Sequence, residues 1–236
     1  MSRINDPEAV HEEYADERRY AARMAKQETA TGVDPYAVVF DAVAECEPDD
    51  VLEVGCGRGE LAERMVHELG ARVVALDQST RMVELTAARG VETIVGDVVD
   101  LPFLDGSFDC TVAAWMLYHA SDLDRALEEL RRVLRPGGRL IAATSSERNL
   151  AEVWELVGEI GAPGGEFTVE GAAPILSRHF SDVDQRDVLG AVTFPDRGAA
   201  HEYLAATASA DVADLLPTFD GPLVASRRLA VFVCSP

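Results

Sequence analysis

The stretch Val51-Leu-Glu-Val-Gly-Cys-Gly-Arg-Gly-Glu-Leu-Ala62 decides the fold of this chain. Its apolar beginning predicts a buried β-strand, and a helical pattern of apolar residues starts directly after the last glycine. Three glycines, Gly55, Gly57 and Gly59, stand in the turn between strand and helix. Glycine adopts positive φ angles without strain and lets a ligand lie against bare backbone. The turn therefore predicts a ligand site at the carboxyl end of this strand.

Short apolar runs alternate with helical patterns around this turn. The sequence predicts strands at 51–54, 72–76, 91–95, 108–115 and 139–143, with helices at 60–69, 80–89 and 123–134 between them. Strands and helices that alternate in this way form right-handed βαβ units, and hence a parallel sheet covered on both faces. Beyond residue 147 we expect helices near 150–159, 172–179 and 197–208, and two strands near 183–193 and 229–234 that complete the sheet. The predicted fold class is α/β, doubly wound.

Local signals predict where several elements start and end. Ser121 with Asp124 matches a capping box at the start of the third helix. Pro136-Gly137-Gly138 predicts the end of that helix and a turn into the next strand. Near the amino end, Pro7 predicts the start of a helix, and residues 29–33 predict a hinge after it.

The bulk composition is that of one globular domain. With 236 residues, 47% hydrophobic and 27% charged, the chain has room for one core plus an insertion. The charged amino-terminal residues do not resemble a signal peptide, and no apolar run is long enough to span a bilayer. The four cysteines form no Cys-Xaa-Xaa-Cys pair, which favours reduced thiols. We therefore expect a cytoplasmic protein without a membrane partner.

The net charge of −21 limits the classes of partner. Such a charge repels phosphate backbones, and the arginine clusters are too short or too interleaved with acids to form a basic stripe. The sequence therefore predicts no nucleic-acid partner and favours a small-molecule substrate. The five histidines show no metal-ligand spacing, so no metal is expected. The sequence does not predict an oligomeric state.

Several kinds of nucleotide site share the geometry of a strand, a glycine turn and a helix. A P-loop requires Gly-Lys-Ser/Thr, whereas Gly59 is followed by Glu60. A dinucleotide fingerprint requires GxGxxG, and here the third glycine comes one residue early. An acid at the helix entrance also disfavours a pyrophosphate. S-adenosylmethionine has no phosphate and carries a positive sulfonium, so Glu53 and Glu60 would not repel it. A turn that merely packs strand against helix remains an alternative.

Two acidic residues follow predicted strands in register with this turn. Asp77 closes the second strand, where a carboxylate is expected to accept both hydroxyls of a ribose. Asp97 follows the third strand, where a carboxylate can accept from an adenine amino group. Either acid alone is ordinary and would serve as a helix cap. Two of them together with the glycine turn favour a nucleoside ligand.

Residues 51–144 resemble the core of the class I S-adenosylmethionine-dependent methyltransferases, in the branch called methyltransferase type 11. The resemblance lies in Glu53-Val-Gly-Cys-Gly-Arg-Gly-Glu, Ala75-Leu-Asp-Gln-Ser, Gly96-Asp-Val-Val-Asp-Leu-Pro-Phe, Ser107-Phe-Asp-Cys-Thr-Val and Leu134-Arg-Pro-Gly-Gly-Arg-Leu. It implies a Rossmann-like sheet of seven strands in the order 3-2-1-4-5-7-6, with the last strand antiparallel. It also implies S-adenosylmethionine as cofactor. From the residue pattern we further expect a helical lid at 1–33, whose apolar stripe is thin, and a methyltransferase domain at 34–236 with a substrate-covering insertion at about 161–222.

The resemblance also implies roles for particular residues. Gly55, Cys56 and Gly57 would line the methionine part of the cofactor, on the strand that carries Glu53. Around the nucleoside, Asp77 would hold the ribose, Gln78 and Met82 would lie beside the adenine, and Asp97 with Val98 would read its edge. Ala114 and Trp115 would border the reacting methyl. Apart from the resemblance, the position of Tyr20 on the predicted amino-terminal helix predicts that its ring covers the cofactor.

His119 is the candidate catalytic base, because it follows the fourth strand at the expected mouth of the site. An equally good interpretation is that it orients the strand end or borders the cofactor. The Asn/Asp-Pro-Pro-aromatic element of adenine methyltransferases is missing after that strand. We therefore expect methyl transfer to an oxygen, nitrogen or carbon nucleophile of a small metabolite. The alternatives are a catalytically silent cofactor-binding or partner subunit and, less favoured, a nicotinamide-dependent oxidoreductase.

Overall fold

The structure is a computed structural model that describes residues 29–159, 165–207 and 210–236. The predicted lid at 1–33, including Tyr20, lies almost wholly outside these residues.

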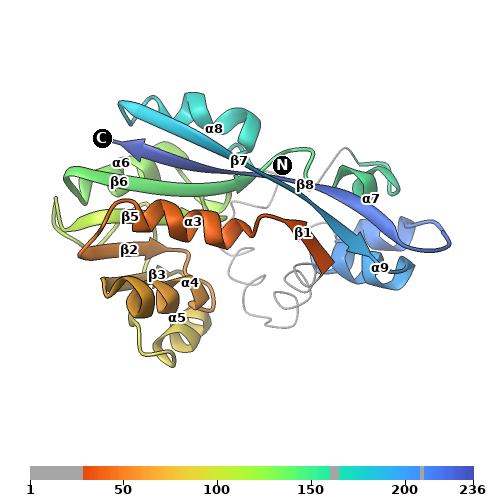
Figure 1. The fold of residues 1–236 in the computed structure, drawn as a ribbon, viewed down its shortest axis with the longest axis horizontal. Coiled ribbons are helices and arrows are strands. Elements are labelled where there is room, and N and C mark those ends of the chain that lie inside the picture. Colours follow the sequence, from red (N-terminus) through yellow and green to blue (C-terminus); the bar gives the residue numbers. More distant parts are fainter. Residues whose placement is uncertain (1–28, 160–164, 208–209) are drawn as a thin grey trace.

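One sheet of eight strands organises the chain (Figure 1). Its order is β1-β7-β8-β6-β5-β2-β3-β4. The strands are β1 (Ala30–Gly32), β2 (Asp50–Val54), β3 (Arg72–Asp77), β4 (Glu92–Val95), β5 (Phe108–Ala114), β6 (Leu134–Ser145), β7 (Asp182–Phe194) and β8 (Leu223–Ser235). Neighbours from β4 to β6 pair in parallel, whereas β8 is antiparallel to both β6 and β7. Counted from β2, this is the predicted order 3-2-1-4-5-7-6.

The eighth strand, β1, corrects the predicted strand count. The local sequence predicts a hinge at residues 29–33, but Ala30–Gly32 pairs antiparallel with β7, with Ala30 opposite Val192. The buried guanidinium of Arg227 on β8 reinforces this edge by donating to the backbone oxygens of Thr31 and Val33. The hinge prediction is therefore wrong, because tertiary pairing holds a segment whose local sequence has no strand pattern.

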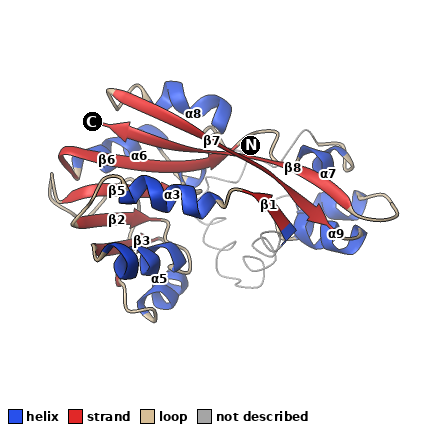
Figure 2. Ribbon diagram, in the orientation of Figure 1, coloured by secondary structure: helices blue, strands red, loops and turns tan. Residues whose placement is uncertain are grey.

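Helices cover both faces of the sheet, as Figure 2 shows. The helices are α3 (Pro35–Ala44), α4 (Glu60–Arg64), α5 (Thr80–Ala87), α6 (Leu123–Arg132), α7 (Ala151–Glu155), α8 (Val169–Leu176) and α9 (Arg197–Ala205). Short 3-10 or π turns are η2 (Met65–Leu69), η3 (Leu117–His119) and η4 (Ala210–Leu215). One core lies between the sheet and α3 with α4, and the other between the sheet and α6 with α8. Within the described ranges, no helix is long and apolar enough to cross a membrane.

Both predicted boundaries of α6 need correction. Its N-cap is Asp122, not Ser121, and the Asp122 side chain accepts from the backbone N–H of Arg125. The helix ends at Arg132, and Pro136-Gly137-Gly138 lies inside β6 as an irregularity opposite β5. A Cβ on Gly138 would lie 2.7 Å from the backbone oxygen of Asp109, so a side chain there would press on β5.

The long ribbon of β7 and β8 extends past the parallel strands and carries a third core. Its register runs from Asp182 opposite Ser235 to Phe194 opposite Leu223. Figure 1 shows α7 and α9 beside its far end. Their apolar side chains pack with those of the ribbon, among them Trp154, Phe194, Tyr203 and Leu204. The predicted insertion at 161–222 therefore includes a full strand of the sheet, and its part after β7 belongs to this distal core.

Candidate active site

The carboxyl ends of four parallel strands meet at one edge of the sheet. The backbone N–H of Gly55, after β2, donates to the oxygen of Leu76 at 2.7 Å. The N–H of Gly96, after β4, donates to the oxygen of Asp77 at 3.1 Å. A Cβ on Gly55 would lie 2.6 Å from the Cβ of Met116, so the segment after β5 also touches the glycine turn. This is the edge at which ligands bind to open α/β sheets.

The glycine turn needs its glycines for both conformation and space. Gly55, Gly57 and Gly59 have φ angles of 68°, 55° and 78°, in the left-handed region that side chains disfavour. A Cβ on Gly59 would lie 2.6 Å from the side chain of Thr86 on α5. Bare backbone at the turn therefore lets β2, α4 and α5 approach one another closely.

The carboxylate of Asp77 joins the first two strand ends. One oxygen accepts from the N–H of Gly57 at 3.0 Å, and the other accepts from the N–H of Ser79 at 2.9 Å. Each carboxylate oxygen can accept a further hydrogen bond. Burial raises the pKa of Asp77, although the bonds from Ser79 and Gly57 oppose this shift. The oriented acceptor suits the paired hydroxyls of a ribose, the role predicted for it.

Glu53 on β2 is a buried acid beside this carboxylate. It is 4% exposed, and its Oε2 has no hydrogen-bond partner. Burial, followed by the charges of Asp77 and Glu60, raises the pKa of Glu53 to about 8. An unpartnered buried oxygen is costly unless a ligand supplies a donor. Glu53 could therefore pair with a cationic group such as the ammonium of a bound amino acid.

The structure places the other predicted nucleoside residues on two adjacent loops. Gln78 follows Asp77 and is half-buried, and Met82 lies fully buried in the first turn of α5. Asp97 is half-buried after β4, and its Oδ1 accepts from the N–H of Val99 at 3.1 Å. The Val98 side chain is 1% exposed in the main core. Val98 can therefore face a ligand only through its backbone.

The end of β5 brings aromatic residues to the same edge. Ala114 is half-buried, and Trp115 has a φ of 55°, unusual for a residue with a large side chain. The Trp115 ring packs on Tyr36 of α3 with centroids 4.9 Å apart. His119 ends η3, where its ring lies 4.5 Å from that of Tyr118. The predicted base thus lies three residues beyond Met116, which touches the glycine turn.

Cys56 contributes backbone rather than a thiol to the site. It is buried, and its Sγ lies 3.6 Å from Oγ1 of Thr86. The Thr86 hydroxyl donates to the Gly57 oxygen at 3.1 Å. Burial also raises the pKa of the Cys56 thiol far above its ordinary value. The site is thus not set up to use a thiolate.

The prediction omitted three residues that shape the site: Thr86, Met116 and Tyr36. Thr86 has a detectable signal, because it lies four positions after Met82 on the inner face of a helix where an apolar residue is expected. The contacts of Met116 and Tyr36 depend on tertiary packing and have no local signal.

Glu60 is less strongly repulsive to a pyrophosphate than the sequence suggests. Its carboxylate pairs with Arg89 at 3.1 Å, which weakens the electrostatic argument against a pyrophosphate and leaves glycine spacing as the stronger one. Among the residues that the structure describes, no cluster could hold a metal ion.

Comparison with known proteins places these features in a family. A family model described as a methyltransferase domain matches residues 52–142. An uncharacterised 37.1 kDa protein from a Streptomyces fradiae transposon is 31% identical over 249 residues, covering 92% of this chain and 71% of that protein. The demethylmenaquinone methyltransferase of Thermobifida fusca is 31% identical over 167 residues, covering 68% of this chain and 63% of its own. The chain thus spans less than two thirds of that named relative.

Solved structures show the same fold. An S-adenosylmethionine-dependent methyltransferase of Thermotoga maritima is 20% identical with a TM-score of 0.59, and the likeness covers 100% of both chains. The [4+2]-cyclase SpnF is 21% identical with a TM-score of 0.60, covering 85% of this chain and 79% of the cyclase. At such identities the likeness concerns the fold alone. With the family match, the sheet order and the glycine turn taken together, the chain belongs to the class I S-adenosylmethionine-dependent methyltransferases of the type 11 branch, and S-adenosylmethionine is its cofactor.

Proposed function

We propose that this protein transfers a methyl group to an oxygen, nitrogen or carbon nucleophile of a small molecule. Relatives whose names state small acceptors support this proposal. They include the demethylmenaquinone methyltransferase described above and a rice protein named a probable tocopherol O-methyltransferase, 34% identical over 144 residues that cover 58% of this chain and 38% of the rice protein. The net charge of −21 further disfavours a nucleic-acid acceptor. The observation that carries the proposal is the convergence of the glycine turn, Asp77 and the end of β5 at one edge of the sheet.

The described residues fit the cofactor in chemistry as well as position. The unpartnered Oε2 of Glu53 suits a positively charged ligand, and the lack of side chains at Gly55 and Gly57, on either side of Cys56, suits a methionine part lying against the backbone. Asp77 suits the ribose, with Gln78 and Met82 next along the chain. Asp97 retains a second oxygen, which suits an adenine amino group, with the Val98 backbone beside it. Ala114 and Trp115 would border the methyl, and Tyr20 would cover the cofactor from outside the described residues.

The bound cofactor supplies an activated methyl group on a sulfonium. The protein's task is to align the acceptor and exclude water, and alignment alone is worth about 7–11 kcal/mol. The packed rings of Tyr36 and Trp115 form an apolar wall that suits this task. His119 would hold or accept the proton of an acceptor whose pKa is high.

Binding of the cofactor and of its demethylated product provides the first test. Calorimetry on the wild-type protein should show uptake of S-adenosylmethionine and S-adenosylhomocysteine. Asp77→Ala should weaken both by about 1–3 kcal/mol, because hydrogen bonds to a charged acceptor are lost. Asp214→Ala is the matched control, since that side chain is 93% exposed on η4. Unchanged affinity in a folded Asp77→Ala variant would contradict the ribose assignment.

His119→Ala tests the proposed base. Release of S-adenosylhomocysteine can be followed with a panel of acceptors that offer a phenolic hydroxyl, a carboxylate or an amine. With an active hydroxyl acceptor, His119→Ala should lower kcat by about 10²–10⁴-fold, as for loss of a general base, while cofactor affinity stays within twofold. Undiminished kcat would remove His119 from the chemistry. No turnover with any acceptor, despite normal cofactor binding, would favour a silent cofactor-binding subunit.

A further inference from the structure

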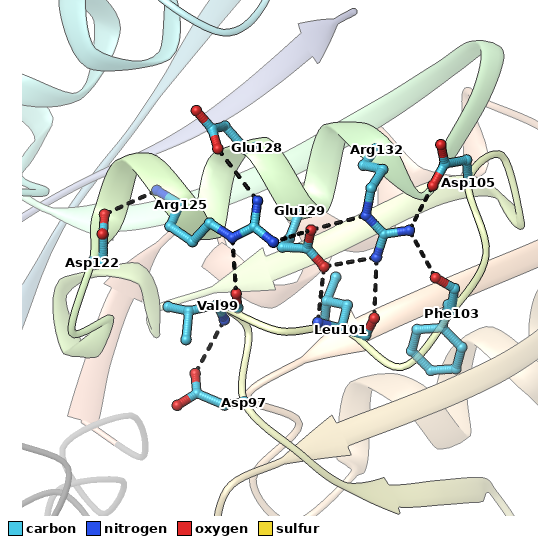
Figure 3. A network of polar contacts seen from close by, with 10 residues as sticks. All are labelled: Asp97, Val99, Leu101, Phe103, Asp105, Asp122, Arg125, Glu128, Glu129 and Arg132. Carbon is cyan, nitrogen blue, oxygen red and sulfur yellow. Dashed lines mark hydrogen bonds and ion pairs between the residues drawn. The ribbon is translucent and has the colours of Figure 1, made fainter.

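The loop between β4 and β5 is held by charged side chains of α6. This loop, residues 96–107, contains no helix or strand of its own and carries Asp97. Three residues on one stripe of α6 reach its backbone: Arg125, Glu129 and Arg132 (Figure 3). Their spacing of four and then three positions places them on one face of the helix. We call these three residues the loop clasp.

Glu129 is the centre of the clasp. It is 2% exposed, and its Oε2 accepts from the N–H of Leu101 at 2.9 Å. Arg132 binds both carboxylate oxygens, at 2.9 and 2.7 Å, and Arg125 adds an ion pair at 3.0 Å. Hydrogen bonds from Arg132, and then the backbone N–H of Leu101 and the charges of both arginines, lower the pKa of Glu129, although burial opposes this shift. A carboxylate is retained at such depth only when its partners satisfy it, as they do here.

The arginines hold the carbonyl groups of the same loop. Arg132 donates to the oxygens of Leu101 and Phe103 at 3.1 and 2.8 Å, and to Asp105 at 2.8 Å. Arg125 donates to the oxygen of Val99 at 3.3 Å. Leu101 is thus fixed through both its N–H and its carbonyl. The backbone groups that the clasp binds belong to every second residue of the loop, Val99, Leu101 and Phe103. These bonds hold the loop backbone in one conformation along α6.

The clasp reaches Asp97 through Val99. The N–H of Val99 donates to Oδ1 of Asp97 at 3.1 Å, while the Val99 carbonyl accepts from Arg125. Figure 3 shows the other Asp97 oxygen directed away from this network. The direction of that free oxygen depends on the orientation of the Val99 peptide groups, and therefore on α6.

We propose that Arg125, Glu129 and Arg132 are positioning residues for recognition of the cofactor's base. They orient the loop so that Asp97 presents one oxygen to the 6-amino group of adenine. This proposal rests on the proposed function, because it assumes that the adenine lies against Asp97. The clasp makes no contact with the base itself and acts through the loop.

The test compares two ligands that differ only at the base. S-inosylhomocysteine has a carbonyl oxygen where S-adenosylhomocysteine has the amino group, so a carboxylate at Asp97 should disfavour it. Wild-type protein should bind the adenosyl compound at least about tenfold more tightly, the worth of one hydrogen bond to a charged group. Glu129→Gln should reduce this ratio to within about threefold of unity, because a neutral amide cannot satisfy both arginines and Leu101. A lower stability alone would not change the ratio of the two affinities, because both ligands are measured on the same folded protein.

Asp109→Asn is the matched control. Asp109 on β5 also pairs with an arginine, Arg135 at 2.8 Å, and accepts from two backbone N–H groups, those of Asp49 and Asp50 at 3.1 and 3.0 Å. It lies at the opposite, amino-terminal edge of β2. This variant should lose stability and keep the wild-type ratio. An altered ratio in Asp109→Asn would overturn the assignment to the clasp, because any carboxylate that pairs with an arginine and accepts from the backbone would then have the same effect.

Two further variants separate the possible failures. Asp97→Asn should abolish discrimination between the adenosyl and inosyl compounds. If this variant binds S-adenosylhomocysteine and still discriminates, the adenine lies elsewhere and the assignment of Asp97 fails. If Asp97→Asn abolishes discrimination and folded Glu129→Gln retains it, the positioning proposal is overturned and the proposed function stands. Should Glu129→Gln not fold, Arg125→Gln replaces it, since the Arg125 side chain is 48% exposed. A reduced ratio in that variant supports the proposal, and an unchanged ratio overturns it.

Discussion

Glu53 and Asp77 are two acids that the fold buries within reach of each other's charge. Burial raises the pKa of both, and for Glu53 the pKa reaches about 8. At neutral pH the folded protein therefore holds a proton on Glu53 that the unfolded chain has released. The described residues offer Oε2 of Glu53 no donor, so the protonated form is the less costly one without ligand.

The stability of the ligand-free protein should consequently fall as pH rises. Between the ordinary pKa of 4.5 and about 8, the unfolded state binds fewer protons than the folded state at Glu53. The free energy of unfolding then declines by at most about 1.4 kcal/mol per pH unit for this one group. Glu53→Gln imitates the protonated form and should show a flatter profile. Urea unfolding at several pH values from 5 to 8 measures both slopes, and parallel profiles would show that Glu53 is ionised in the folded protein.

At the scale of elements, the turn from β2 into α4 depends on a close contact with α5. Gly59→Ala should destabilise the protein for two reasons, its φ of 78° and the Thr86 side chain 2.6 Å from the new Cβ. Gly70→Ala is the matched control, because Gly70 has a φ of 69° and nothing within 4 Å of an added Cβ. The left-handed conformation alone costs about 1–2 kcal/mol, and overpacking adds about 1–3 kcal/mol. If chemical unfolding shows that Gly59→Ala and Gly70→Ala lose the same free energy of unfolding, the Thr86 side chain moves away from the new Cβ without an energetic penalty.

The elements that the sequence predicts well are those with local signals. The run 51–62 combines an apolar strand, a glycine turn and a helix start, and each of these patterns depends on neighbouring residues alone. The site residues Asp77 and Asp97 follow from the same logic, because parallel strands bring their carboxyl ends to one edge. The seven-strand order comes from the family resemblance, and periodicity would not supply it.

Elements held by distant partners are the ones that local patterns miss. β1 has only three residues, Ala-Thr-Gly, and exists because β7 pairs with it. Pro136-Gly137-Gly138 has the composition of a turn, yet flanking pairs with β5 keep it within β6. Ser121 and Asp122 are both good N-caps, and only the helix geometry selects the second. The contact between Met116 and Gly55 likewise requires the folded sheet.

At the scale of the whole molecule, charge balance should make stability depend on salt. Acidic side chains outnumber basic ones by 42 to 21, so repulsion among unpaired acids exceeds the attraction within exposed ion pairs, which are individually weak. Sodium chloride screens both. We expect the Tm to rise by about 2–4 °C, equivalent to about 1 kcal/mol, between low salt and physiological ionic strength or above. A falling Tm in differential scanning calorimetry would show that the ion pairs dominate.

The place of β8 between β6 and β7 separates the order of synthesis from the order of assembly. A ribosome makes β7 before β8, yet among the described strands the three-residue β1 is the only one with which β7 pairs before β8 has been inserted beside β6. Every nascent chain therefore passes through a stage in which β2 to β6 can already pair while β6 still exposes an unpaired edge. When β8 pairs with β6, it covers that edge and brings β7 into the sheet. Before this step the nascent chain is most prone to aggregate and to bind chaperones.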